Sequence, residues 1–277
     1  MLRRLLIRPG GIGDCILSLP ALEYLIADHT EVWAPGAVAP LIRFADRVRS
    51  LSSTGLDLVG LPDVESPRET IAALAQFDSI VSWYGANRAD FRDAVARLGL
   101  RFRFLEALPR EQHITHAADF FLRQAGGGGA GGGTAIPRIP CPRSDGGFAA
   151  IHPFSGGASK NWPLERFRTL AKRLNIPVRW CAGPEEPLPD ATRFDDLHQL
   201  ALWLARARLF IGNDSGITHL AAAVGTPVVA VFGPTDPTVW GPRGERVRVV
   251  SSARGWPGVE EVLASASELL AELRGVV

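Results

Sequence analysis

The sequence has few cysteines and no long apolar run. Its 277 residues include three cysteines, Cys15, Cys141 and Cys181, which are widely spaced and form no C-x-x-C pair. This pattern argues against a disulfide framework and a structural zinc site, and it favours a reducing compartment, the cytoplasm. No run of about 18 apolar residues occurs, and the short apolar stretch near the N-terminus ends in Pro-Gly-Gly. Neither a membrane span nor a signal peptide is therefore expected.

Net charge is also nearly absent. The 30 basic and 29 acidic residues give a formal charge of +1, so no global field would attract nucleic acid or an anionic membrane. The aromatic residues are scattered without a basic stripe, and no nucleic-acid partner is expected. Any anionic ligand must be held by local groups. A hydrophobic content of 46% is enough for one large or two compact domains.

Short apolar, β-branched stretches alternate with helical patterns in two series. The predicted strands are Leu5–Ile7, Val32–Trp33, Leu56–Val59 and Ile80–Trp83 in the first series and Ala149–Ile151, Val178–Cys181, Leu209–Ile211 and Val228–Phe232 in the second. Such alternation is typical of βα units, in which the strands form a parallel sheet. The sequence therefore predicts the α/β fold class.

A segment rich in glycine and proline separates the two series. It runs through Ala125–Gly133 and continues into the proline-rich stretch Pro137–Pro142. Glycine leaves a chain flexible and proline extends it, so a linker is expected here. We predict an N-terminal domain over residues 1–125, a linker over 126–146, a second domain over 147–257 and a C-terminal helix within 258–277.

Helix signals are clearest in the second series. Apolar residues at helical spacing predict helices over Pro163–Leu174 and Val259–Leu273. A third helix runs through Leu220 to Val224, with Ser215 as its expected N-cap and Gly225 ending it.

A glycine-rich turn, residues 8–14 (RPGGIGD), follows the first predicted strand, and a helical pattern begins after it. Gly11 and Gly13 suggest a dinucleotide loop, but Ile16 stands where the third glycine belongs, and Asp14 in the first helical turn would repel a pyrophosphate. A dinucleotide site is disfavoured. A helix N-terminus keeps Asp14 ionised and able to accept a proton. Helix capping is the alternative, and the local sequence leaves both open.

A second loop, residues 152–163 (HPFSGGASKNWP), follows the strand at 149–151. Gly156 leaves backbone N–H groups accessible, the hydroxyls of Ser155 and Ser159 can donate, and Lys160 adds a positive charge. These groups predict a phosphate-binding loop, although the pattern is not a Walker A motif. The alternative is a polar loop with a surface lysine.

A third loop, residues 212–219 (GNDSGITH), begins a further helix. The backbone amides of Ser215 and Gly216 and the helix dipole favour an anion, whereas Asp214 could cap the helix or hold the loop in shape. A nucleophile elbow would need glycine at Asn213, so a hydrolytic serine is disfavoured. Loops at the carboxyl ends of neighbouring parallel strands can converge, and together they predict a nucleotide site.

No metal site is expected. His113 and His116 stand three apart on a helical pattern, but no carboxylate-rich partner accompanies them, and an ordinary helix surface is the preferred interpretation. No D-x-D pair supplies a metal-binding alternative.

Three blocks resemble a known family. They are IRPGGIGDCILSLPALEYL (7–25), HPFSGGASKNWPLERFRTLAKRL (152–174) and GNDSGITHLAAAVGTPVVAVFGPTDPTVWGP (212–242), and together they cover roughly a quarter of the chain. In this order they resemble glycosyltransferase family 9, the heptosyltransferases. The resemblance implies the GT-B architecture, in which two Rossmann-like domains face across a cleft, the first holding the acceptor and the second the nucleotide-sugar. It also suggests a C-terminal helix that can cross back to the first domain.

The resemblance implies an inverting, metal-independent glycosyltransferase that moves a heptose from ADP-heptose to a lipopolysaccharide-core or related glycan acceptor. No cofactor is implied besides the ADP-sugar donor. The acceptor is a glycan or glycolipid, and a lipid-linked acceptor would bring this cytoplasmic protein to the inner membrane as a peripheral partner. The oligomeric state is left open. The alternative is a catalytically inactive GT-B-like nucleotide-binding protein.

The resemblance assigns Asp14 as the general base and Lys160 as the cation that stabilises the departing diphosphate, with Gly11 and Gly13 in the acceptor-side loop. Glu185 or Glu186 matches the acid that contacts the ribose, and the segment that follows is shorter than is usual in the family. From the loops and the resemblance together, the predicted donor site comprises Ser155, Gly156, Ser159, Lys160, Glu185, Asp214, Ser215, Gly216 and His219.

Overall fold

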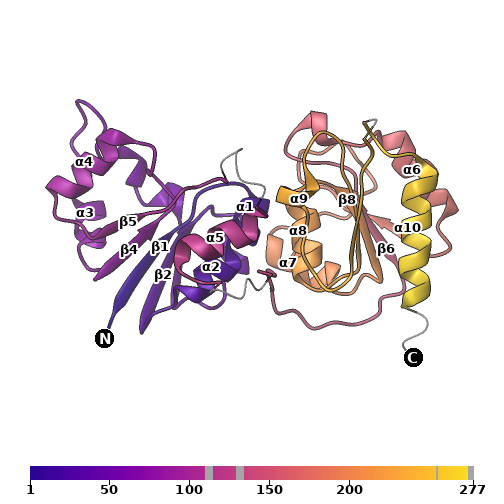
Figure 1. Ribbon diagram of the computed structural model, residues 1–277, viewed down its shortest axis with the longest axis horizontal. Helices are drawn as coiled ribbons and strands as arrows, with labels where there is room; N and C mark the ends of the chain where they lie inside the picture. Colours follow the sequence, from indigo (N-terminus) through magenta and orange to yellow (C-terminus); the bar gives the residue numbers. More distant parts are fainter. Residues whose placement is uncertain (110–114, 129–133, 254, 274–277) are drawn as a thin grey trace. The chain divides into compact units, whose positions relative to one another are not determined.

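The computed structural model describes residues 1–109, 115–128, 134–253 and 255–273, and it divides the chain into two compact α/β units (Figure 1). The boundary lies between Ala135 and Ile136, within the segment rich in glycine and proline, and His116 is counted in the second unit. Each unit has a five-stranded sheet, and every strand pairing is parallel. The predicted α/β class with two Rossmann-like domains is confirmed.

The first unit has the strand order β3-β2-β1-β4-β5. Its strands are β1 (Arg3–Ile7), β2 (His29–Ala34), β3 (Arg47–Ser50), β4 (Ser79–Ser82) and β5 (Phe102–Phe104). Its helices are α1 (Ile12–Leu17), α2 (Leu19–Tyr24), α3 (Arg68–Leu74), α4 (Ala89–Arg97) and α5 (Ala117–Ala125), with short 3₁₀ turns η1 (Ala39–Leu41), η2 (Leu51–Ser53) and η3 (Leu56–Leu58). Leu5, Ile7, Trp33, Ile80 and Phe91 are fully buried in its core.

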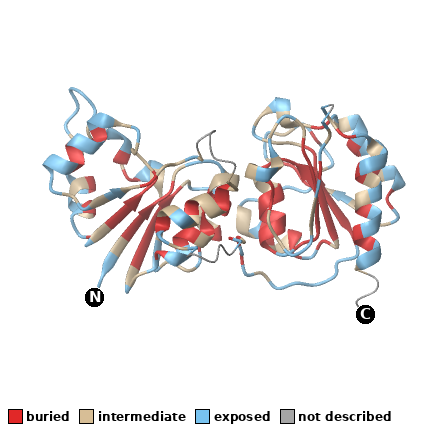
Figure 2. Ribbon diagram, viewed as in Figure 1, coloured by how far each residue is buried: buried red, intermediate tan, exposed pale blue. Residues whose placement is uncertain are grey.

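The second unit has the order β10-β9-β8-β6-β7. Its strands are β6 (Ala149–His152), β7 (Val178–Trp180), β8 (Leu209–Asn213), β9 (Val228–Val231) and β10 (Val247–Val250). Its helices are the 3₁₀ turn η4 (Ala158–Lys160), α6 (Leu164–Arg173), α7 (Leu197–Leu204), α8 (Gly216–Ala223), α9 (Pro237–Trp240) and α10 (Val259–Glu272). Strands β6, β8 and β9 are buried along their whole length, as expected for a parallel sheet covered on both faces (Figure 2).

The C-terminal helix α10 packs within its own unit. Its apolar face, made by Val262, Ala266 and Leu269, joins the core under α6 and beside β8, β9 and β10. The resemblance to GT-B proteins suggested a helix that can cross back to the first domain, whereas the contacts of α10 secure the second sheet. Arg173 of α6 pairs with Glu260 of α10 at the surface.

One predicted strand is wrong. The stretch Leu56–Val59 forms the turn η3 instead, between Gly55 and Gly60, whose φ angles are +66° and +76°. Leu56 and Val59 are buried while the two residues between them are exposed, so the apolar pair has the three-residue spacing of a 3₁₀ turn.

The segment between β7 and α7 is short. Within it a single bridge joins Cys181 to Thr192, beside the edge of the sheet. This agrees with the sequence prediction that the segment after Glu186 is short. The chain therefore reaches α7 directly after the loop that carries Glu186.

The sequence prediction placed His113 and His116 on an ordinary helix surface. His113 lies outside the described residues. His116 precedes α5 instead of standing on a helix surface, and its Nε2 is 2.8 Å from the carbonyl oxygen of Gly241. That expectation is wrong for His116, because its ring is engaged with a loop of the second unit. Nowhere in the described ranges do three His, Cys, Asp or Glu side chains gather as a metal site would require.

None of the described helices combines the length and apolar character that a bilayer span requires.

Candidate functional site

The carboxyl ends of β6 and β8 lie side by side in the second unit. His152, the last residue of β6, is in register with Gly212 of β8, and β7 flanks β6 on the other side. After β6 the next strand, β7, lies on one side of it in the sheet. The following strands, β8, β9 and β10, lie on its other side. Ligands of open α/β sheets bind at such a point, where the strand order reverses.

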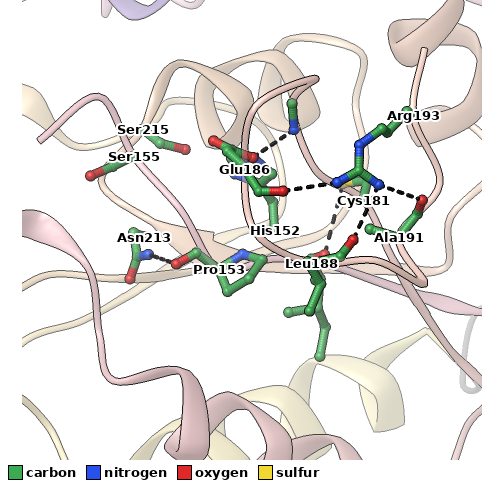
Figure 3. A network of polar contacts seen from close by, with 12 residues as sticks. His152, Pro153, Ser155, Cys181, Glu186, Leu188, Ala191, Arg193, Asn213 and Ser215 are labelled. Carbon is green, nitrogen blue, oxygen red and sulfur yellow. Dashed lines mark hydrogen bonds and ion pairs between the residues drawn. The ribbon is translucent and has the colours of Figure 1, made fainter. Parts of the chain in front are cut away.

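Asn213 ties the loop after β6 to the end of β8. Its side chain is fully buried, and its Nδ2 donates to the Pro153 carbonyl at 2.7 Å (Figure 3). Its Oδ1 accepts from the Trp162 backbone N–H at 2.9 Å. One amide thus holds both ends of the loop. The sequence indicated only that Asn213 excludes a nucleophile elbow. Its role in holding the loop could not be predicted, because the two contacts join residues that are 60 and 51 positions apart.

Ser155 shapes the middle of that loop. Its Oγ lies 2.8 Å from both the Gly157 carbonyl and Asn161 Oδ1, and it can donate to one of them at a time. A Cβ added at Gly156 or Gly157 would meet no atom of the described residues within 4 Å, so the loop faces open space there. Ser159 is exposed in η4. The face of the loop is accessible to a ligand.

Lys160 and Asp214 form the charged centre of the site. Lys160 Nζ is 3.0 Å from Asp214 Oδ2, which also accepts from Thr235 Oγ1 at 2.8 Å. Asp214 is 7% exposed and Lys160 33% exposed, so the carboxylate lies beneath the ammonium. His219 Nε2 lies 4.0 Å from the other carboxylate oxygen. An ammonium has three N–H donors, and Asp214 accepts one of them.

The N-terminus of α8 adds a partial positive charge. Ser215 is its N-cap, as predicted, and its Oγ accepts from the Thr218 N–H. Gly216 opens the helix, and the first amides of a helix have no partner within it. Val224 is the C-cap and Gly225 follows with φ +81°, as expected for the glycine that ends the helix. Together with Lys160, the helix end suits a diphosphate.

Glu186, and not Glu185, is held at the end of β7. Glu185 is exposed, whereas the Glu186 carboxylate accepts from His152 Nε2 at 3.0 Å and from the Gly183 N–H at 2.6 Å (Figure 3). Burial alone would raise the pKa of Glu186, but the hydrogen bonds from His152 and Gly183 and the charge of Arg193 hold it below its ordinary value. Glu186 is thus the acid of this pair that the fold holds in place, whereas Glu185, which the sequence prediction placed in the donor site, is exposed.

In the first unit, Asp14 lies at the start of α1, which begins at Ile12, three residues before the predicted position. Asp14 Oδ2 accepts from the backbone N–H of the N-cap Gly11 at 2.9 Å, so the capping role exists. The glycine that the geometry requires is Gly10, with φ +120° and with Asp14 atoms 3.1 Å from where its Cβ would stand. Gly13 lies within α1 and Gly11 is extended.

Arg8 supports this loop from beneath, a role that the sequence analysis missed. It is 1% exposed, and its guanidinium donates to the carbonyls of Pro9 at 2.8 Å and Asp14 at 3.1 Å. The guanidinium also lies 4.6 Å from the centre of the Phe121 ring.

Burial lowers the pKa of Arg8 and raises that of the Cys15 thiol to about 11. Cys15 is therefore an inert core thiol.

Residues 191–265 match the model of glycosyltransferase family 9 (heptosyltransferase). Among curated proteins, lipopolysaccharide heptosyltransferase 2 of Escherichia coli K12 is 32% identical over 132 residues, 38% of this chain and 36% of that protein. Lipopolysaccharide heptosyltransferase 1 of the same strain is 30% identical over 128 residues, 41% of this chain and 40% of that protein. The matched stretches thus span well under half the length of these relatives.

A solved structure of similar fold is E. coli ADP-heptose LPS heptosyltransferase II, with a TM-score of 0.74 and 17% identity over 99% of this chain and 100% of that one. The E. coli heptosyltransferase WaaC with ADP has a TM-score of 0.67 and 20% identity over 99% of both chains. These likenesses establish the fold of the two parallel-sheet domains.

Proposed function

We propose that this chain is a member of glycosyltransferase family 9, the heptosyltransferase family, and that it transfers a heptose from ADP-heptose to a lipopolysaccharide-core or related glycan acceptor; the match of residues 191–265 to the family model and the partial similarity to curated heptosyltransferases support the proposal. The transfer is a single displacement that inverts the anomeric carbon and uses no metal ion. The observation that carries the proposal is the Lys160–Asp214 pair beside the N-terminus of α8, at the point where the strand order reverses.

On the donor side, Lys160 and the first amides of α8 bind the diphosphate and stabilise the charge that develops as it leaves. Asp214 keeps the ammonium in place, since a lone lysine side chain samples many rotamers. Glu186 accepts the ribose hydroxyls, because an acid at the end of the second strand of a Rossmann unit has that role. The hydroxyl of Ser159 and the open backbone at Gly156 complete the loop over the phosphates.

On the acceptor side, Asp14 removes the proton of the attacking hydroxyl. The oxygen then bonds to the anomeric carbon while the bond from that carbon to the diphosphate oxygen breaks, and ADP departs. Asp14 stands in the first turn of α1, at the positive end of the helix. A lipid-linked acceptor would bring the protein to the cytoplasmic face of the inner membrane.

The test is titration of the purified protein with ADP, UDP, GDP and NAD in EDTA, followed by assay of ADP release from ADP-heptose with an acceptor. We expect metal-independent binding of ADP in preference to the other three, and ADP release that depends on the acceptor. Preference for UDP or GDP would change the donor, and binding of NAD alone would overturn the proposal. Tight ADP binding without transfer would instead mark a catalytically inactive nucleotide-binding protein.

A further inference from the structure

The last residue of β6 is a buried histidine that contacts Glu186 (Figure 3). The His152 side chain is 5% exposed and that of Glu186 27% exposed, and His152 Nε2 lies 3.0 Å from Glu186 Oε2. The His152 ring also lies edge to face with Phe154, 6.2 Å between centres. The histidine thus lies behind the carboxylate, and the carboxylate reaches the surface at the end of the sheet.

The hydrogen bond has a defined direction. His152 Nδ1 is buried and has no hydrogen-bond partner among the described residues. Nε2 is therefore the ring nitrogen through which His152 acts, and because an ionised carboxylate only accepts, Nε2–H is the donor to Glu186. The histidine is thus a buried donor held behind the carboxylate.

The turn that carries Glu186 is held on the other side as well. The Gly183 N–H donates to the same carboxylate oxygen at 2.6 Å, and Arg193 Nη2 donates to the Glu186 carbonyl at 2.8 Å. Arg193 Nη1 lies 3.1 Å from the Leu188 carbonyl. The thiol of Cys181, nearby in the core, has its pKa raised by burial and by the charge of Glu186, so it is a neutral neighbour. Oε2 of Glu186 therefore accepts two hydrogen bonds within the protein, which fix the orientation of the carboxylate.

We propose that His152 is a positioning residue that sets Glu186 to accept the vicinal hydroxyls of the nucleotide ribose, which makes His152 a determinant of donor recognition. This inference rests on the proposed function, in which Glu186 contacts the ribose. Two vicinal hydroxyls present two donors in a fixed relation, and with Oε2 engaged the two lone pairs of Oε1 are left to accept them. With Oε2 held by His152 and Gly183, the rotation of the carboxylate is fixed before the nucleotide arrives.

The test compares ADP with 2′,3′-dideoxy-ADP by titration calorimetry for the wild type, His152→Leu, His152→Gln and Glu186→Gln. We expect the wild type to prefer ADP by about tenfold or more, which is the contribution of hydrogen bonds to a charged acceptor. His152→Leu keeps much of the volume but loses the donor, so the ratio should fall toward that of Glu186→Gln. His152→Gln carries an amide N–H₂ of similar reach and should restore the ratio.

The affinity for dideoxy-ADP separates positioning from folding. Under the proposal it stays unchanged in His152→Leu, because the phosphate contacts are intact. An unchanged ratio in His152→Leu, or an equal loss for both nucleotides, would overturn the positioning role. A wild type that binds both nucleotides equally also overturns it while leaving the proposed function intact. A wild type that binds neither nucleotide fails the proposed function itself, and the role of His152 with it.

Discussion

At the scale of single residues, Lys160 is the first side chain to change. It is one of two lysines in the chain, and its ammonium lies on the buried carboxylate of Asp214. Lys160→Ala should weaken ADP binding about 10- to 100-fold, since a hydrogen bond between charged groups contributes about 1.5–3 kcal/mol. Titration calorimetry with ADP measures this.

The matched control is Lys172→Ala, which removes the other lysine, exposed on α6. That variant should bind ADP as the wild type does. Equal ADP affinity in Lys160→Ala and wild type would refute the phosphate contact.

Asp14 should separate chemistry from donor binding. Asp14→Asn keeps an oxygen that can accept from the Gly11 N–H, so the start of α1 is preserved. The amide cannot take a proton from the acceptor, and kcat should fall about 10²- to 10⁴-fold with the ADP affinity unchanged. Steady-state assays of ADP release, with ADP titration as the control, check both halves. A variant that transfers sugar at the normal rate would rule out Asp14 as the base.

The carboxylate of Glu186 should couple stability to pH. Its ordinary pKa of 4.5 is lowered in the folded protein, with burial opposing the shift and the contacts to His152 and Gly183 outweighing it. A lowered folded value means that the ionised form stabilises the fold above pH 4.5, and that this stabilisation is lost as pH falls through the folded value. The Tm advantage of wild type over Glu186→Gln should therefore be largest near neutral pH and shrink below pH 4.5.

Glu185→Gln is the control for that series, because the neighbouring side chain is exposed. Its Tm should follow the wild type at every pH. A Tm difference between wild type and Glu186→Gln that stays constant from neutral pH to pH 3 would contradict the linkage.

The sequence predicted the residues of the site that follow one another in a motif. Lys160, Asp214 and Ser215 stand at the ends of buried strands, and the rule for parallel sheets brings those ends together. Asn213 and His152 were missed because their roles depend on partners 60 and 34 positions away along the chain. A local pattern carries no signal for such contacts. The sequence likewise could not tell which of Glu185 and Glu186 is held by its neighbours, because the contact of Glu186 to His152 spans 34 positions.

At the scale of elements, strands buried on both faces were predicted and most edge strands were not. Strands β6, β8 and β9 are buried along their whole length and begin with apolar runs, whereas β3 reads Arg-Val-Arg-Ser at an edge of its sheet. An edge strand meets solvent and tolerates charge, so its sequence resembles a loop. The strands β5 and β10, also at edges, were missed for the same reason.

Helix α10 should be essential to the second unit. Leu269 is 2% exposed in the core that α10 shares with α6 and the sheet. Leu269→Ala should lower the free energy of unfolding by about 2–5 kcal/mol through lost burial and the cavity that remains. Urea unfolding with the exposed variant Ser267→Ala as control measures the difference. A cost below about 1 kcal/mol would show that α10 is dispensable to this core.

At the scale of the whole molecule, the two-unit organisation could be predicted because two strand series flank a segment whose glycine- and proline-rich sequence is typical of a linker. Each unit has its own five-stranded sheet and its own buried cluster, centred on residues such as Trp33 in the first and Trp162 in the second. The strand order was not predictable from the pattern alone, since alternation gives the sequence of elements but not which strands become neighbours.

This division predicts where a nucleotide acts. The candidate donor groups all belong to the second unit, so ADP should slow amide hydrogen exchange in residues 153–161, 183–186 and 213–219. At ADP concentrations near 100 Kd, local unfolding that releases ADP should become about 100-fold rarer. This corresponds to a rise of about 2.7 kcal/mol in the free energy of that opening. Exchange followed by mass spectrometry in EDTA tests this, with residues 8–14 as the internal reference. Protection of the Asp14 loop without protection of the Lys160 loop would place the nucleotide in the first unit and overturn the assignment of the donor site.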